Sequence, residues 1–448
     1  MKHLTSALVA VSPNRVIKFL TALGLMVMTF GTLWSAYLRQ GYSETISFFV
    51  QDGWCETGSE GFGAHCFGDL YAPMSIASNP DPWSQDFKLA YTPLNFAYFR
   101  LLNSSILGSL GSHTSLVINI VLTIAALAIP GLYIWRHQTK FAGISGLWVL
   151  LISLTSAPSI IMLDRGSSSF LLFPLVFFFY RAIYDQRYTL ATLTVTLMSL
   201  WKPQTAILTI GILIFFGSRR FIKSICYVAF SFLCSFLLYP TNLPMNLTDW
   251  LKNSSAYQNY VPIPTPGNYS FVNFIGFLKG GMNLLFFGAE NLQDAFRPPL
   301  AENVVSLISI ILALTFVVLI LLNKKWISLN HFTLISSIFL LTIPGTTFGY
   351  YLTLMLIPLF VLDRNLNARS INEGMSNLVY GLYLLLLFLM IPPWPFNWGN
   401  LPIEVGSSWA TLGVHWMLVH FVASIIVLLS ILQLIQLRIL GSTRFRRS

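Results

Sequence analysis

The feature that most limits how this chain can fold is a series of apolar runs that reach, or nearly reach, the length needed to cross a lipid bilayer. About 20 apolar residues in a helix span the hydrocarbon core, because each residue adds about 1.5 Å. With 9% charged and 55% hydrophobic residues, the chain belongs to the membrane class rather than the soluble one. We therefore predict an all-α polytopic integral membrane protein, a bundle of about 12 transmembrane helices. The expected spans are residues 17–37, 116–135, 142–163, 168–184, 188–201, 205–217, 221–240, 304–322, 332–345, 352–363, 378–393 and 416–438.

The direction of the chain through the membrane depends on the apolar stretch 94–111, which Asn95, Arg100 and Asn103 interrupt. We expect this stretch to lie at the surface or to re-enter, since a further span here would invert every later segment. With the N-terminus inside, most of the 26 basic residues then fall on the inner side, whereas only three of the 16 acidic residues do. Cytoplasmic loops carry such an excess of Lys and Arg. The pattern predicts a multi-pass protein of the cell membrane with both termini cytoplasmic, and it accounts for the basic net charge without any nucleic acid.

Two long segments, 38–115 and 241–303, are rich in Pro, Gly, Asn and aromatic residues, and both face outward in this topology. Residues 394–415 form a third, smaller outer segment, and no inner loop is as long. Loops that carry irregular, aromatic and acidic residues tend to carry function. We therefore expect residues 1–448 to form one transmembrane domain with an extracytoplasmic active face, and the first outer segment to contribute a catalytic acid and surface helices.

Cys55 and Cys66 lie in the first outer segment with three glycines between them, a spacing that could close a disulfide on an oxidising side of the membrane. His65 beside them would suggest a partial metal site, but further ligands are missing, so the disulfide is favoured. The sequence also shows no nucleotide-binding glycine loop. We expect no cofactor, and although a divalent cation could assist, nothing in the sequence indicates one.

Polar residues recur at the outer ends of the expected spans. The stretch LDRGSSS carries Asp164 and Arg165, LWKPQTA carries Lys202 and Gln204, and TIPGTTFGYYL carries Tyr350. A cation at this depth needs a partner, and a lipid phosphate at the outer leaflet is a suitable one. The structural alternatives are that Arg165 pairs with Asp164 or extends to the interface, and that Lys202 and the following proline form an ordinary turn.

The stretch FGDLYAPM places Asp69 in the first outer segment, shortly after the two cysteines. An acidic residue is unusual in a chain with so few charges. The structural alternative for Asp69 is a solvated carboxylate or the N-cap of the helix that follows.

The order of these motifs resembles that of glycosyltransferase family 87 over roughly residues 40–365. The stretches that carry the resemblance are GDLYAPMSIASNPDPW, AYTPLNFAYFRLL, DRGSSSFLLFPLVFFFYRA, LMSLWKPQTAILTIGILIFFGSRRF and PGTTFGYYLTLMLIPL. Members of that family are GT-C enzymes that use polyprenyl-phosphate sugars, and they include mannosyl- and arabinosyltransferases. The resemblance implies a GT-C-like fold and a donor of that class.

The resemblance places the family's acid and the tyrosine after it on Asp69 and Tyr71, and its Lys-Pro element on Lys202 and Pro203. Its Tyr-Pro-Pro stretch appears as Tyr91-Thr92-Pro93, with one proline lost. Its Arg-Gly-Asn motif appears as Arg165-Gly166-Ser167, with serine in place of asparagine.

These observations predict transfer of a sugar, mannose or arabinofuranose, from a polyprenyl-phosphate donor to a glycolipid or cell-envelope glycan acceptor at the bilayer surface. A carboxylate must take the proton of the acceptor hydroxyl, and cations must hold the phosphate while its bond to the sugar breaks. We expect Asp69 to be this base, with Asp52 in reserve. The residues expected to bind substrate are Arg165, Lys202, Asp164, Tyr71, Tyr91, Gln204 and Tyr350.

Two other functions stay open. An O-antigen polymerase or ligase would share an outer site but would favour a long late loop rich in Arg and His. A transporter or flippase of lipid-linked sugars would show paired repeats and functional polar groups in the middle of its spans.

Overall fold

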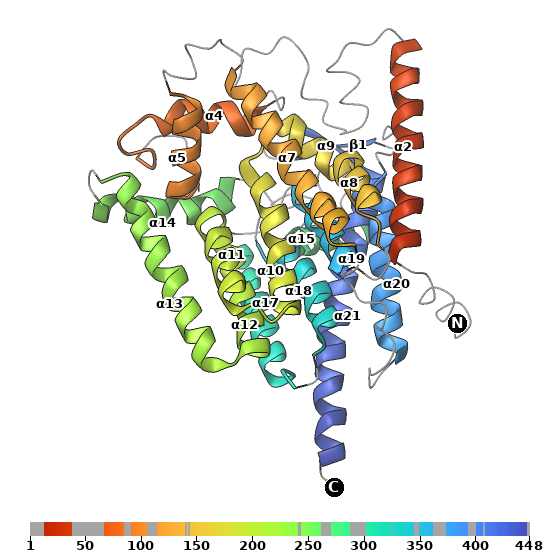
Figure 1. The fold of residues 1–448 in the computed structure, drawn as a ribbon. Coiled ribbons are helices and arrows are strands. Elements are labelled where there is room, and N and C mark those ends of the chain that lie inside the picture. The colour runs from red at the N-terminus through yellow and green to blue at the C-terminus, as the bar shows by residue number, and fades with distance from the viewer. Residues whose placement is uncertain are drawn as a thin grey trace.

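The computed structural model (Figure 1) describes residues 13–37, 67–84, 91–104, 114–138, 141, 144–240, 243–260, 270–286, 302–325, 327–344, 349–361, 373–392, 400–405 and 408–445. Within these residues the chain is almost entirely helical. The α-helices are α2 (Pro13–Tyr37), α4 (Gly68–Ala77), α5 (Pro93–Leu102), α7 (Thr114–Arg136), α8 (Gly146–Thr155), α9 (Ala157–Arg165), α10 (Leu172–Tyr184), α11 (Tyr188–Trp201), α12 (Thr209–Phe216), α13 (Ser218–Ser235), α14 (Leu243–Tyr260), α15 (Phe271–Phe286), α17 (Glu302–Leu322), α18 (Leu329–Thr342), α19 (Ile357–Val361), α20 (Glu373–Met390) and α21 (Val414–Phe445). Short 3₁₀ helices connect some of them: η2 (Ser168–Leu171), η3 (Pro203–Leu208), η4 (Phe236–Leu238) and η5 (Gly349–Leu356).

The exception to the helical fold is a hairpin in the third outer segment. Strands β1 (Asn400–Val405) and β2 (Ser408–Gly413) pair antiparallel, with Asn400 opposite Gly413 and Val405 opposite Ser408. The sequence analysis expected only an irregular loop here. Ile, Val, Trp and Thr recur in the two strands, and these residue types favour the extended backbone.

Each expected span contains helix in the part of the chain that the structure describes, but the count of twelve crossings is not confirmed. Among the described residues, five helices are long and apolar enough to cross a bilayer: α2, α7, α13 with η4, α17 and α21. The bent pair of α8 and α9 makes a sixth if it counts as one span. The other expected spans are helices of 10–17 residues, about 15–26 Å long against a hydrocarbon core of roughly 30 Å.

The described part of the ambiguous stretch, residues 94–104, lies in the short helix α5, which ends at Leu102, and in the turn after it, whereas residues 105–111 lie outside the described residues. Thr92 caps its N-terminus by accepting a hydrogen bond from the Asn95 N–H, and Pro93 occupies the first helical position, where a missing N–H costs nothing. Ten residues give a length of about 15 Å, half of a membrane span. A surface or re-entrant position suits this length.

The expected span 142–163 is broken between α8 and α9, which meet at an angle of 54°. Ser156 at the break is extended, and Pro158 follows at the start of α9, where proline favours a new helix over the continuation of an old one. Upstream, α8 packs closely on α7: a Cβ on Gly131 would lie 2.6 Å from the Leu150 backbone nitrogen. Small residues allow such close approach of membrane helices. The bend aims the C-terminus of α9 away from the axis of α8.

The main hydrophobic core surrounds α10, which is buried on nearly all sides. Phe173 of α10 meets Phe360 of α19, and Tyr180 meets Phe332 of α18, with ring centroids 6.3 Å and 6.2 Å apart. The Tyr180 hydroxyl also shares hydrogen bonds with two buried serines of α18, Ser336 and Ser337. Helices distant in sequence are thereby fixed around one central element.

A second, separate core joins parts of the segments 38–115 and 241–303 to the end of α13 and η4, and we call it the cap. Its buried apolar residues are Leu70, Met74, Ala77, Trp83, Phe96, Phe99, Leu102, Phe236 and Tyr239, with Trp250 of α14 packed against them. Full burial of a large apolar side chain contributes about 1.5–3 kcal/mol, so this cluster can hold α4, α5 and α14 together. The sequence predicted that these segments face the same side of the membrane, but not that they share a core.

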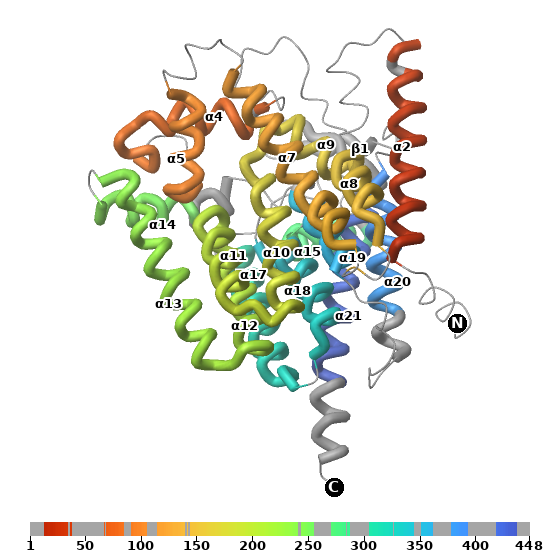
Figure 2. The backbone as a smooth tube through the Cα atoms, viewed as in Figure 1, coloured from red at the N-terminus to blue at the C-terminus, as the bar shows by residue number. Residues whose placement is uncertain are grey.

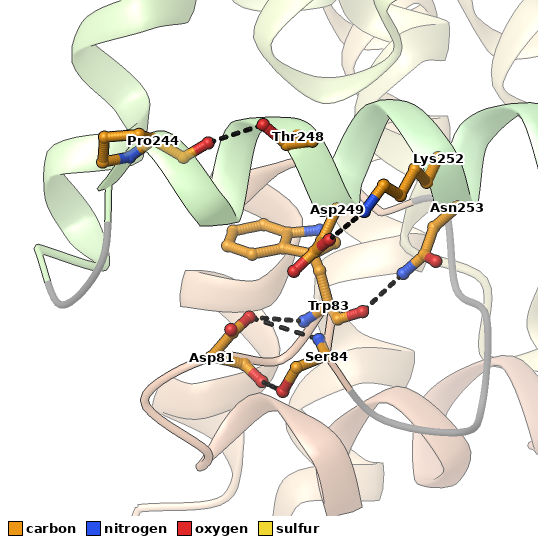
Figure 3. A network of polar contacts seen from close by, with 8 residues as sticks. All are labelled: Asp81, Trp83, Ser84, Pro244, Thr248, Asp249, Lys252 and Asn253. Atoms are coloured by element: carbon orange, nitrogen blue, oxygen red, sulfur yellow. Dashed lines mark hydrogen bonds and ion pairs between the residues drawn. The ribbon is translucent and has the colours of Figure 1, made fainter.

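Hydrogen bonds join the turn at residues 81–84 to α14 within the cap (Figure 3). The Asp81 carboxylate accepts from the backbone N–H groups of Trp83 and Ser84, both at 3.2 Å, and so fixes this turn. The Asn253 side chain on α14 donates to the Trp83 carbonyl oxygen at 2.7 Å. At its exposed edge, α14 also carries an ion pair of 3.3 Å between Lys252 and Asp249.

The cap lies at one end of the helix bundle (Figure 1). The tube view shows α13 running along the edge of the bundle and bringing α14 beneath α5 (Figure 2). The first turn of α13, which carries the exposed Arg219 and Arg220, lies at the opposite end (Figure 1). The acidic and aromatic segment and this basic turn are therefore separated along the bundle, as the charge pattern predicts.

Candidate functional site

Asp69 and Arg165 meet between the cap and the bundle. The Arg165 Nη2 donates to Asp69 Oδ1 at 3.3 Å, and the two side chains are only 15% and 19% exposed. Asp69 is the second residue of α4, so its carboxylate also benefits from the positive end of the helix dipole. The N-cap of α4 is Phe67 rather than Asp69, so the alternative of a capping aspartate is wrong.

The turn after Arg165 is shaped to receive α4. Arg165 ends α9, where a cation is favourable, and Gly166 caps the helix with a left-handed φ of 64°. The Phe67 N–H donates to the Asp164 carbonyl oxygen at 2.7 Å, and a Cβ on Gly166 would lie 2.9 Å from the Leu70 Cβ. The Asp164 side chain is itself buried, 4% exposed. The start of α4 therefore fits directly against the Arg-Gly turn.

Phe67 shares the left-handed conformation of Gly166, with φ at 57°. A bulky side chain seldom adopts this region, and it costs about 1 kcal/mol or more. The two left-handed residues face each other, because a Cβ on Gly166 would also lie 3.4 Å from the Phe67 ring. A strained non-glycine residue, Phe67, thus lies beside the Asp69–Arg165 pair.

Lys202 lies where α11 gives way to η3. Its backbone is extended and Pro203 follows, so the helix ends here. The Lys202 ammonium lies 5.4 Å from the centroid of the Tyr91 ring and 5.7 Å from that of Tyr351. Aromatic faces attract a cation at this range. Among the residues that the structure describes, no carboxylate lies within ion-pair distance of Lys202, which leaves its charge available to an anion.

A closed loop of hydrogen bonds among Asn95, Trp201 and Ser168, which we call the polar ring, connects the segments that carry the two cations. The Asn95 amide donates to the Trp201 carbonyl oxygen at 2.6 Å and accepts from the Ser168 hydroxyl at 2.8 Å. The Trp201 indole N–H donates to the Ser168 carbonyl oxygen at 2.7 Å. Trp201 directly precedes Lys202, and Ser168 follows Arg165 by three residues. We did not predict these hydrogen bonds from the sequence, although Asn95 in the apolar stretch 94–111 was a signal for them.

Two further hydrogen bonds join residues near the polar ring to neighbouring helices. Ser169 donates to the Tyr351 hydroxyl at 3.1 Å, which links the turn after Arg165 to one of the rings beside Lys202. Tyr98 donates to Asn119 of α7 at 2.6 Å. Burial raises the pKa of Tyr98 well above its usual value, so its hydroxyl stays protonated and remains a donor. The cap contributes as well, because the Trp83 indole donates to the Tyr91 carbonyl oxygen at 2.9 Å.

The remaining expected site residues have different positions. Tyr71 is 43% exposed on α4, and Gln204 is exposed on η3. Tyr350 lies in η5, but its side chain is not among the described ones. In η5 it is the neighbouring Tyr351 whose ring faces Lys202. Asp52, Cys55 and Cys66 lie outside the described residues, so the reserve base and the expected disulfide remain predictions.

In chemical terms the site joins a carboxylate, two cations and several aromatic rings at one end of the bundle. Within the described part of the chain, no three His, Cys, Asp or Glu side chains are grouped closely enough to hold a metal ion. Comparisons with protein-family models, with curated proteins and with solved structures find no match to the chain.

Proposed function

We propose that the protein is an integral membrane glycosyltransferase that moves a sugar from a polyprenyl-phosphate donor to a glycolipid or cell-envelope glycan acceptor. The observation that carries this proposal is the contact between Asp69 and Arg165, made beside a turn that is linked to Lys202 through Asn95. A proton acceptor and two phosphate-binding cations are what transfer from a phosphate donor requires.

In the proposed reaction, the oxygen of an acceptor hydroxyl attacks the anomeric carbon of the donor sugar. The bond between that carbon and the phosphate oxygen breaks, and polyprenyl phosphate leaves with the electron pair. Asp69 takes the proton of the acceptor hydroxyl. Arg165 and Lys202 stabilise the charge that develops on the phosphate, because guanidinium and ammonium groups both donate to phosphate oxygens.

The pairing of Asp69 with Arg165 suits this chemistry. A guanidinium presents five N–H donors in a planar fork, so it can hold the carboxylate and still donate to a phosphate. The base and the leaving group would then lie on opposite edges of one arginine. Lys202, held near Tyr91 and Tyr351, would contact the phosphate from a second direction.

The proposal assigns the cap end of the bundle to the extracytoplasmic side of the cell membrane, where a lipid-linked donor presents its sugar. The basic ends of α13 and α17 would then be cytoplasmic, as the positive-inside rule requires. Mannose and arabinofuranose are the sugars favoured by the resemblance to glycosyltransferase family 87.

The test is an assay of membranes containing the protein with radiolabelled polyprenyl-phosphate mannose and polyprenyl-phosphate arabinofuranose side by side. We expect one donor to yield a labelled glycan or glycolipid together with free polyprenyl phosphate. Asp69→Asn should lower the rate about 100- to 10,000-fold, the usual cost of losing a general base. Asp81→Asn is the matched control, because asparagine can still accept the hydrogen bonds of that turn.

Three results would count against the proposal. Transfer at the normal rate in Asp69→Asn, with Asp52→Asn inactive, would move the base to Asp52. Movement of the intact donor across the membrane without release of polyprenyl phosphate would identify a transporter. Absence of transfer from both donors would remove the assigned donor class.

A further inference from the structure

The Asn95 side chain is fully buried, and both of its polar ends are engaged. Its Nδ2 donates to Thr92 Oγ1 at 2.9 Å and to the Trp201 carbonyl oxygen at 2.6 Å, while its Oδ1 accepts from Ser168 Oγ at 2.8 Å. A buried amide without hydrogen-bond partners costs about 1–3 kcal/mol or more. The Asn95 amide has partners at both ends, so it avoids this cost and holds the groups that it binds.

One of the groups that Asn95 holds is the Trp201 carbonyl group at the end of α11. The last carbonyl groups of a helix lack partners within the helix, and the Thr205 N–H, four residues after Trp201, donates to the Lys202 carbonyl oxygen instead. Asn95 supplies a donor to Trp201 from a different helix, 106 positions earlier in the chain. The Trp201 indole is fixed in turn by its bond to the Ser168 carbonyl oxygen. Both the backbone and the side chain of Trp201 are therefore held.

Lys202 is the next residue after this fixed peptide. Its backbone is extended, with φ −142° and ψ 101°, and from there its side chain reaches toward the rings of Tyr91 and Tyr351. A free lysine side chain has about 2 kcal/mol of rotamer entropy, so a firmly held backbone helps to limit where the ammonium can go. Across the polar ring of Asn95, Trp201 and Ser168, the residue Ser168 lies in the short turn that follows Arg165.

We propose that Asn95 is a positioning residue, which holds the Lys202 ammonium and the turn after Arg165 at a fixed separation through Trp201 and Ser168. Its importance for a phosphate donor rests on the proposed function, whereas the positioning itself does not. Asn95 lies too deep to contact substrate, and it acts only through the residues that it holds.

The first test measures the reactivity of the Lys202 amine with an acylating reagent, quantified by peptide mapping of the purified full-length protein. Lys252, whose side chain is 71% exposed on the cap, is the internal reference. Asn95→Asp keeps the shape but replaces both N–H donors with an acceptor, so it should release the Trp201 peptide. We expect the labelling rate of Lys202 relative to Lys252 to rise at least threefold. Ser168→Ala, which removes a single hydrogen bond, should give a smaller rise.

Tyr180→Phe is the matched control, because it also removes buried hydrogen bonds, but in the main core and away from the ring. If Asn95→Asp and Ser168→Ala leave Lys202 labelling as low as in Tyr180→Phe, Asn95 does not position Lys202 and the inference is wrong. The milder Ser168→Ala keeps this test decisive even if Asn95→Asp fails to fold.

A second measurement separates this inference from the proposed function. In the sugar-transfer assay, Ser168→Ala and Asn95→Asp should raise the KM for the polyprenyl-phosphate donor about tenfold more than Tyr180→Phe does. Changed labelling with an unchanged donor KM would refute the link to donor binding. If the wild-type protein transfers no sugar, the proposed function fails, and the labelling ratio alone still decides whether Asn95 positions Lys202.

Discussion

Asp69 and Arg165 are 96 positions apart in the sequence, yet their charges pair at 3.3 Å where α4 meets α9. The pair is mostly shielded from water, which strengthens the attraction and raises the cost of losing one partner. It joins α4 of the cap to the helix bundle, beside the Phe67–Asp164 backbone bond. The same contact thus has a structural role and, in the proposed function, a catalytic one.

The energetic coupling of this pair can be measured with a double-mutant cycle. Asp69→Ala, Arg165→Ala and the double variant should give a coupling free energy of about 1 kcal/mol or more in thermal unfolding in detergent, since residues in direct contact are not additive. The pair Lys252–Asp249 is the control, and its coupling should be smaller because the lysine side chain is 71% exposed. Equal coupling in the two cycles would mean that the buried pair is no more than a surface contact.

Loss of the Lys202 charge should weaken use of the donor without unfolding the protein. Lys202→Met keeps the length and apolar stem of the side chain but removes the ammonium that lies near Tyr91 and Tyr351. We expect kcat/KM for the polyprenyl-phosphate donor to fall about 100-fold, in the range seen when one charge-stabilising donor is removed. Lys252→Met should leave kcat/KM unchanged. Wild-type kinetics in Lys202→Met would place the phosphate elsewhere.

A methyl group at Gly166 should separate α4 from α9. Gly166→Ala combines a strained left-handed φ with a Cβ only 2.9 Å from the Leu70 Cβ. We expect the free energy of unfolding to fall by about 1–3 kcal/mol and sugar transfer to fall with it, because Asp69 would shift away from Arg165. Gly281→Ala is the control: nothing lies within 4 Å of the added methyl in α15, so stability should be unchanged or improved. An equal response of the two variants would refute the close fit of α4 on the turn.

The assignment of sides can be tested with single cysteines in a variant that lacks the four native ones. Cysteines at Ser75 or Lys252 of the cap should react with a membrane-impermeant maleimide in intact cells, whereas cysteines at Arg219 or Lys324 should react only after lysis. All four positions are exposed, so access does not limit the reaction. Labelling of Lys324→Cys in intact cells would place the basic end of the bundle outside, and the proposed active face would be wrong.

The sequence predicted the positions of the helices well and their membrane crossings less well. Apolar runs locate helices such as α7 and α17 directly, because burial in lipid or protein requires apolar side chains. The break at Ser156 and the short length of helices such as α11 were not predictable, since a short apolar run can cross, re-enter or pack in a protein core. The hairpin β1–β2 was missed because its polar, glycine-containing segment resembled an irregular loop.

The sequence by itself determined that a few charged residues, including Asp69, Arg165 and Lys202, lie next to apolar segments, because composition and helix-ending residues such as Gly and Pro are local properties. Only the tertiary structure decided which of them meet. Asp69 pairs with Arg165, Asn95 reaches Trp201, and Tyr351 faces Lys202, across separations of 96, 106 and about 150 positions. Such contacts depend on how the bent pair of α8 and α9, the short α5 and the shared cap core pack against one another. A local sequence pattern does not determine that packing, because the packing depends on the fit of side chains from many helices at once.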